Sequence, residues 1–357
     1  MTEKDLKILI FAPYYLPHKY GLSVYIDEFS KHLSPSVSKI TIFTSKVFED
    51  SSEHELRYKN VEVIRFPAFY LVYNYPFPKF WTMKFWKMLF LLRKIKYDLV
   101  VTNGRFFILS FIGVVFAKMK NLRCLHIEHV SNFTILSNRL KNFFARIYDF
   151  ILGRLVFKMA DVNVAPSTDV AFFIKRFDSR KPSIIFNGLN IEEIEQVRNL
   201  ESIRNKYRDK IIICYLGRLC KWKGIEDSVE IIKSLTKEIR EKIIFLIIGF
   251  GEDFDKIKKL SKGENSIKMM GEIPRHEAIG ILKIADIYLH SAMPGGALSY
   301  SLLEAMYCKC AVVATPNEGA KDVIKNEING YVFGSKEEAI NIVSNLISND
   351  KKRRDIA

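Results

Sequence analysis

Short apolar segments alternate with longer segments of helical periodicity along the chain. In the first half, seven apolar stretches are predicted as strands, at residues 6–13, 39–44, 61–66, 97–103, 122–128, 161–166 and 182–187. Most of them are separated by a segment long enough to form a helix. Parallel strands need such crossover connections, so this pattern predicts a parallel sheet with helices on both of its faces.

The second half repeats the scheme. Strands are predicted at residues 211–217, 242–249, 266–271, 286–290 and 311–315, and helical segments at 228–235, 274–285 and 301–306. Between the halves, the turn Asn187-Gly188 is followed by a polar run at 190–210. We therefore predict an α/β protein of two Rossmann-like, doubly wound domains, 1–190 and 191–357. Ligands bind outside the carboxyl ends of such sheets, so we expect the two domains to face a cleft.

The cysteine content suits a reducing compartment. The chain has 357 residues and five scattered cysteines, an odd number that argues against a disulfide framework. The longest apolar run, residues 106–117, is shorter than the ~20 residues that a membrane-spanning helix needs. The apolar run near the start is short and follows mixed charges, unlike a signal peptide. We expect a cytoplasmic protein that is not integral to the membrane.

Positive charge is concentrated in the first half. The net charge is +15, of which residues 1–190 carry +13 from 28 basic and 15 acidic side chains. Lys79–Lys96 combines aromatic and apolar residues with six basic residues and no acids, and Arg139–Lys158 has a similar pattern. Basic amphipathic helices bind anionic membranes, so we predict a peripheral position on the inner face of the cell membrane. The alternative is that these faces pack on the sheet and their charges are merely solvated.

The stretch GRLCKWKG, residues 217–224, is a candidate anion site. Arg218, Lys221 and Lys223 precede a helix predicted to begin near Ile225. Cations at a helix start oppose the helix dipole, and an anion held between them and the backbone N–H groups would remove the conflict. The alternative is a solvated basic turn.

The stretch PGGALSYSLLEA, residues 294–305, contains two adjacent glycines, which have no side chain, and one acidic residue. Gly295 and Gly296 allow a ligand to approach the main chain closely, and the N–H groups of the following helix point toward it. Ser301 and Glu304 also fit a capping box, in which the acid merely bonds the start of the helix.

Two residues of the first half are further candidates. His129 follows a predicted strand directly, and Gly21 lies between the first strand and the first helix, where a phosphate or sugar could approach. The alternative for His129 is a structural hydrogen bond. The sequence has no Gly-x-Ser-x-Gly or His-Glu-x-x-His motif, and no zinc-type cysteine spacing.

In this order, the segments resemble the GT-B glycosyltransferases of family 4, which are retaining and use nucleotide sugars. The resemblance covers nearly the whole chain. It rests on YLGRLCKWKG, LIIGFGE, KMMGEIPRHE, ADIYLHSAMPGGALSYSLLEAMYCKCAVVAT and NEGAKDVIKNEINGYVF. It implies that the second domain binds the nucleotide sugar and that the first binds the acceptor.

The resemblance also implies residue roles. The basic pair Arg218 and Lys223 would hold the donor diphosphate and stabilise charge on the leaving group without a metal. Glu304 would bind the ribose and Ile273 would flank the base. The remaining implied contacts are His129 and Gly21 beside the transferred sugar, and Gly296, Ala297, Leu298 and Ser299 along the phosphates. The expected donor is a UDP- or GDP-sugar, with no cofactor.

This chain departs from the family pattern where a first acid often lies eight residues before the second. That position is Gly296. Tyr20 stands where a second glycine is common, and many relatives continue beyond the position of Ala357.

We expect a glycosyltransferase with a lipid-linked acceptor, such as a polyprenyl phosphate or a glycan carried on one. The alternative is a non-catalytic GT-B module that binds a sugar or a partner. Nucleic-acid binding is disfavoured, because the chain carries no recognised nucleic-acid module.

Overall fold

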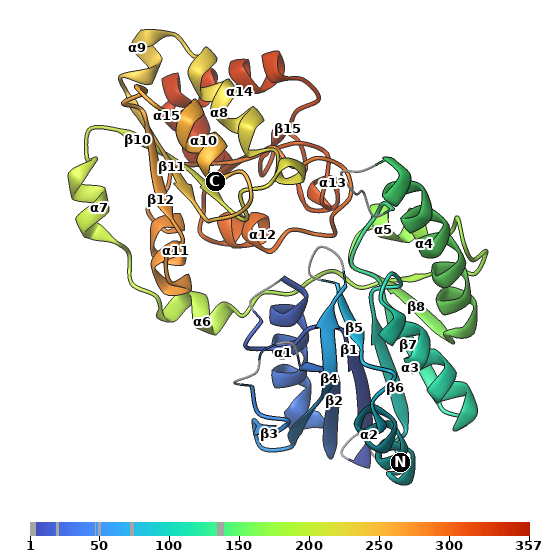
Figure 1. Cartoon of the computed structure of the whole chain (residues 1–357). Coiled ribbons are helices and arrows are strands. Elements are labelled where there is room, and N and C mark those ends of the chain that lie inside the picture. Colours follow the sequence, from blue (N-terminus) through green and yellow to red (C-terminus); the bar gives the residue numbers. More distant parts are fainter. Residues whose placement is uncertain (1–4, 19–20, 47, 49–50, 72–74, 134–138) are drawn as a thin grey trace. The chain divides into compact units, whose positions relative to one another are not determined.

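The computed structural model describes residues 5–18, 21–46, 48, 51–71, 75–133 and 139–357. The chain divides into two compact units, Met1–Ile185 and Phe186–Ala357 (Figure 1). The sequence predicts this boundary after residue 190.

The first unit is built on one nine-stranded sheet. Its strands run in the order β3-β4-β2-β1-β6-β7-β8-β9, with β5 paired to β4. The pairs are parallel except β3–β4 and β4–β5. The strands are β1 (Lys7–Ala12), β2 (Lys39–Lys46), β3 (His54–Arg57), β4 (Val61–Tyr70), β5 (Pro76–Pro78), β6 (Leu99–Asn103), β7 (Arg123–Ile127), β8 (Val162–Ala165) and β9 (Ser183–Ile184).

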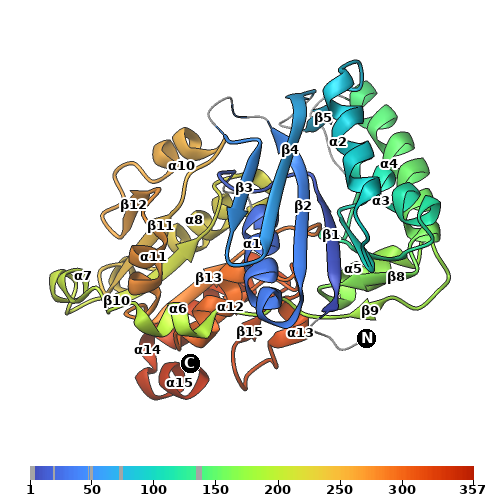
Figure 2. The same cartoon turned by 90° about the horizontal axis from the view of Figure 1, so that it is seen from below.

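Helices cover both faces of this sheet. One core joins the sheet to α2, α3 and α4, and a second core on the opposite face includes Ile26 of α1. Figure 2 shows α2, α3 and α4 grouped on one side of the strands. The helices are α1 (Gly21–Leu33), α2 (Met83–Lys94), α3 (Ile108–Met119), α4 (Arg139–Met159) and α5 (Thr168–Ile174). Gly113 lets α3 approach the sheet, because a Cβ there would lie 2.5 Å from Thr102 Cγ2.

The second unit contains a six-stranded sheet in the order β12-β11-β10-β13-β14-β15. All of its pairs are parallel. β11 is apolar and buried along its whole length, as expected of a central parallel strand. The strands are β10 (Ile211–Leu216), β11 (Ile243–Ile248), β12 (Ile267–Gly271), β13 (Ile287–His290), β14 (Ala311–Ala314) and β15 (Tyr331–Val332).

Two apolar cores flank this second sheet. One contains residues of α8, α10, α14 and α15, and the other contains residues of α6, α11, α12 and α13. The helices are α6 (Ile191–Gln196), α7 (Glu201–Lys206), α8 (Ile225–Ser234), α9 (Lys237–Arg240), α10 (Phe254–Leu260), α11 (Arg275–Leu282), α12 (Tyr300–Tyr307), α13 (Ala320–Val323), α14 (Lys336–Ser348) and α15 (Asp350–Ile356). The loops after β10, β11, β13 and β14 therefore emerge at one edge of the sheet, where most of the predicted donor residues lie.

Candidate functional site

Glycines pack the loops at this sheet edge directly against one another. Gly224, in a left-handed conformation with φ 65°, ends the turn after β10, and a Cβ there would lie 1.7 Å from the carbonyl oxygen of Ser291. A Cβ on Gly249 would lie 1.9 Å from the carbonyl oxygen of Gly217. Only glycine allows such contact between main chains. The loops after β10, β11 and β13 thereby pack against one another as one rim of the sheet.

Lys223 reaches from this rim to a buried acid. Its Nζ donates to both carboxylate oxygens of Glu318, at 2.8 and 2.7 Å. His290, at the end of β13, places Nε2 3.1 Å from Glu318 Oε2. Burial alone would raise the pKa of Glu318, but Lys223 and His290 hold this pKa below its usual range. Glu318 is therefore ionised at neutral pH.

The loop before α12 lies against the same acid. A Cβ on Gly296 would lie 2.3 Å from Glu318 Oε1, and the backbone N–H of Ser299 donates to the Glu318 carbonyl at 3.1 Å. Ala297 is half-buried and Leu298 is buried, with the Leu298 carbonyl accepting from Asn187 Nδ2 at 2.8 Å. The structure thus brings Lys223 together with the predicted phosphate loop, residues 296–299.

Arg218 lies on the same turn as Lys223 but is more exposed. Its guanidinium pairs with Glu252, and its side chain retains 42% of its exposure, against 18% for Lys223. A cation that keeps contact with solvent is available to an incoming anion.

Glu304 lies on α12 with its side chain buried. Its Oε1 accepts from Arg275 Nη1 at 2.7 Å, and Arg275 Nε also donates to Glu193 at 2.8 Å. Burial raises the pKa of Glu304 despite the nearby Arg275 charge. The capping-box alternative is wrong, because α12 begins at Tyr300 with Ser299 as its N-cap, and the Glu304 carboxylate turns to α11 instead.

Ile273 precedes α11 and is two residues from Arg275. Its side chain is half-buried and packs against the core beneath α11 and α12. This packing accounts for an apolar residue at the position whether or not a base stacks on it.

In the first unit, His129 follows β7 and is half-buried. Its Nε2 lies 3.1 Å from Asn103 Oδ1 at the end of β6, and the Tyr25 ring packs edge-on at 4.8 Å. Burial lowers the pKa of His129 to about 4, so the imidazole is neutral at pH 7. Gly21 begins α1, one turn before Tyr25, and no described heavy atom lies within 4 Å of a Cβ built there. Tyr20 lies outside the described residues.

A buried ion cluster adjoins His129 and was not predicted. Arg105 Nη1 lies 3.2 Å from Glu128 Oε2, and Arg105 Nη2 donates to Asp149 at 2.9 Å. All three side chains are almost fully buried. Burial alone would raise the pKa of Glu128, but Arg105 holds it well below its usual range. Glu128 also accepts from the His129 backbone N–H at 2.8 Å, so the cluster fixes the loop that carries His129. In the sequence, only the charged residues Arg105 and Glu128, just after β6 and β7, could have indicated this cluster.

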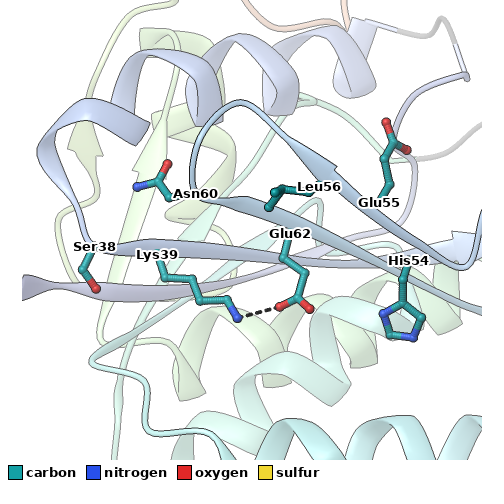
Figure 3. A pocket seen from close by; sticks show the side chains of 7 residues that line it. All are labelled: Ser38, Lys39, His54, Glu55, Leu56, Asn60 and Glu62. Atoms are coloured by element: carbon teal, nitrogen blue, oxygen red, sulfur yellow. Dashed lines mark ion pairs between the residues drawn. The ribbon is translucent and has the colours of Figure 1, made fainter.

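A surface hollow of about 420 Å³ lies elsewhere in the first unit (Figure 3). Lys39 and Glu62 form an ion pair at 2.8 Å along it. These residues begin β2 and β4, so the hollow is at the amino ends of the strands, opposite the edge that carries His129. It includes none of the predicted site residues. In the part of the chain that is described, no three His, Cys, Asp or Glu side chains gather as metal ligands would.

Comparison with known families accounts for both units. Residues 196–357 match the family described as Glycosyl transferases group 1, and residues 20–193 match Glycosyltransferase Family 4. An uncharacterized glycosyltransferase of Methanocaldococcus jannaschii is 41% identical over 360 residues, which cover 98% of this chain and 92% of that protein. The chain belongs to the family 4 glycosyltransferases.

More distant relatives of this glycosyltransferase include the GPI3 subunit of a phosphatidylinositol N-acetylglucosaminyltransferase of Saccharomyces cerevisiae. It is 24% identical over 354 residues, covering 94% of this chain and 75% of the relative. Sucrose-phosphate synthase of Thermosynechococcus elongatus has a similar fold, with a TM-score of 0.78 at 16% identity and coverage of 98% and 92%. HepE of Anabaena, solved in complex with UDP, gives a TM-score of 0.72 at 16% identity, covering 99% and 92%. The GT-B fold prediction is confirmed.

Proposed function

We propose that this glycosyltransferase moves a sugar from a UDP- or GDP-sugar to a lipid-linked acceptor at an anionic membrane surface, with retention of configuration. The donor occupies the carboxyl edge of the second sheet. The acceptor meets the basic first unit. The protein is cytoplasmic and peripheral to the inner face of the cell membrane.

Arg218 and Lys223 stabilise the departing nucleoside diphosphate. Negative charge grows on this leaving group as the glycosidic bond breaks, and fixed cations bind it more strongly as it grows. The start of α12, beyond Gly296–Ser299, supports the same anion through the partial positive charge of a helix N-terminus. These groups perform the electrostatic task without a metal. The fold shared with the HepE complexes containing UDP and UDP-glucose supports a donor of this class.

Glu304 and His129 complete the proposed donor contacts. A buried carboxylate is a suitable acceptor for ribose hydroxyls, and Arg275 shares its charge. His129 is neutral because burial lowers its pKa to about 4, so it offers the transferred sugar a hydrogen bond rather than a positive charge. Ile273 flanks the base.

The proposed membrane binding rests on a row of exposed apolar side chains along α4. The side chains recur every three or four residues on one side of the helix. They are Leu140, Phe143, Phe144, Ile147, Ile151 and Leu155, each more than 40% exposed. Exposed apolar surface of this extent marks an interaction site, and basic residues beside it favour an anionic lipid surface. The exposed basic residues of the helix are Arg139, Lys141, Arg146, Arg154 and Lys158.

The α2 region presents the same chemistry. Trp86 and Phe90 are 50% and 55% exposed, and Lys87 lies between them. Aromatic side chains beside lysines are typical of membrane interfaces. No described helix is long and apolar enough to cross a bilayer.

The names of two relatives indicate acceptors that are carried on lipids. One is the phosphatidylinositol enzyme subunit of yeast. The other is a Campylobacter jejuni N-acetylgalactosaminyltransferase, named for an acceptor on undecaprenyl diphosphate and 24% identical over 306 residues. Both support a lipid-linked acceptor here.

The direct test is nucleoside-diphosphate release from UDP-glucose, UDP-N-acetylglucosamine and GDP-mannose, with and without a host lipid extract. We expect release from one donor, stimulated by lipid. Arg218→Ala should lower kcat/KM for release about 100-fold, because it removes a charge that acts mainly in the transition state. Arg240→Ala removes an equivalent cation on α9, outside the site, and should leave release unchanged.

If no donor releases nucleoside diphosphate while UDP or GDP still binds, the non-catalytic alternative is favoured. If nucleotide is released but lipid does not stimulate the release, the proposed transfer stands and the lipid-linked acceptor is rejected.

A further inference from the structure

Glu318 is the most buried acid at the donor edge, and the sequence motifs give it no role. Its side chain is 1% exposed, on the loop between β14 and α13. Its backbone is left-handed, with φ 50°, a conformation that favours glycine. Strained backbone of this kind persists where the surrounding structure holds it, and it clusters at functional sites.

The carboxylate occupies the space of a side chain at position 296. A Cβ on Gly296 would lie 2.3 Å from Glu318 Oε1 and 2.9 Å from both Cγ and Cδ of Glu318. These distances are far below van der Waals contact, so any side chain at 296 would overlap the acid. Gly296 and Glu318 therefore form a complementary pair, in which the glycine makes room and the other loop supplies the carboxylate.

The contacts of Glu318 are those of a positioning group. Both of its oxygens accept from Lys223 Nζ, which fixes the position of the ammonium. His290 Nε2 lies 3.1 Å from Oε2. The Ser299 N–H donates to the Glu318 main chain and ties the start of α12 to the same residue. One residue thus orients the cation, the loop and the helix start.

We propose that Glu318 is the positioning acid of the donor site and replaces, in space, the carboxylate that the family pattern often places at position 296. This inference rests on the proposed transfer from a nucleotide sugar. Glu318 holds Lys223 where the leaving diphosphate develops charge.

A purely structural role accounts less well for these observations. A buried ion pair contributes little net stability, because desolvation offsets the attraction between its charges. A left-handed backbone adds a further cost that glycine would avoid. The arrangement is explained if the carboxylate is needed for the function of Lys223.

The test exchanges the two residues. Glu318→Gly should lower kcat for nucleotide release about 10- to 100-fold, because Lys223 loses its orientation. The Kd for UDP or GDP should change less than about threefold, because both cations remain. Gly296→Glu alone should unfold at a lower temperature, since two carboxylates would compete for one space. The double variant Gly296→Glu/Glu318→Gly should recover at least about a tenth of the wild-type kcat, because the carboxylate returns from the other loop.

Glu327→Gly is the matched control. Glu327 is also left-handed, with φ 65°, but it is exposed and lies outside the donor edge. Its replacement should leave kcat unchanged.

Two results would overturn the inference while the proposed transfer stands. One is full activity of Glu318→Gly, and the other is a folded double variant no more active than Glu318→Gly. Wild-type protein that releases no nucleotide from any donor would overturn the proposed transfer and this role of Glu318 with it.

Discussion

His129 differs from an exposed histidine in its proton affinity. Burial lowers its pKa to about 4, whereas an unfolded chain has a histidine pKa near 6.5. The unfolded state therefore binds this proton first as pH falls. Stability from the neutral imidazole is complete above about pH 6.5 and is lost progressively down to about pH 4.

We predict a measurable difference between wild type and His129→Gln in acid. Glutamine keeps a donor for Asn103 but does not titrate. Between pH 7 and pH 5, the free energy of unfolding of the wild type should fall by up to about 2 kcal/mol more than that of the variant. Urea unfolding at the two pH values measures this difference. Equal losses in both proteins would show that His129 is not desolvated.

Residue types and spacing made Arg218, Lys223 and Glu304 candidates in the sequence, and the family resemblance implied their roles. Their contact partners could not be selected in this way. Glu318 is 95 residues from Lys223, and Arg275 is 29 residues from Glu304. Both pairs form only when loops or helices from different strands meet at one sheet edge. Glu318 follows a strand and lies in the motif NEGAKDVIKNEINGYVF, but neither feature assigned it a role.

At the scale of elements, apolar runs located the long buried strands well. Three short strands were missed, namely β3, β5 and β15. β3 has the sequence HELR and lies at the sheet edge with alternately exposed side chains, so it has no apolar run to detect. β5 and β15 have only three and two residues. Their pairing depends on neighbours that the local sequence does not specify.

The turn after β10 gives a sharp prediction about loop packing. Gly224→Ala should destabilise the second unit by more than about 3 kcal/mol, because the left-handed conformation and the overlap with the Ser291 carbonyl both oppose it. Gly263 is the matched control. It is also left-handed, with φ 82°, but no described heavy atom lies within 4 Å of a Cβ there.

Gly263→Ala should therefore cost only about 1–2 kcal/mol. Thermal unfolding of both variants measures the contrast. Equal losses would mean that the loop after β13 shifts easily, contrary to tight packing of Gly224 against Ser291.

At the scale of the whole molecule, charge and exposed apolar surface both concentrate in the first unit. The wild type should therefore sediment with vesicles that contain anionic phospholipid. Phe143→Ser/Phe144→Ser should weaken this binding by at least about tenfold, because two exposed rings on α4 lose their burial in lipid. The melting temperature should not fall, since both rings are already exposed in the folded protein.

Leu56→Ser is the control for general hydrophobicity. Leu56 is 72% exposed on β3, away from α4, and its replacement should leave vesicle binding unchanged. Raising the salt concentration should weaken binding of all three proteins, because it screens the basic residues. Wild-type binding that is absent at moderate salt would contradict the membrane proposal.

The pairing of Gly296 with Glu318 bears on how inactive members of such a family are recognised. A rule that counts acids at a fixed spacing before Glu304 would classify this chain as a pseudoenzyme. The carboxylate is nevertheless present, 2.7 Å from Lys223 Nζ, on a loop that follows a different strand. A rule based on distance from the lysine would retain it. Pseudoenzyme surveys should therefore compare where charges lie in three dimensions before they record a lost residue as a lost activity.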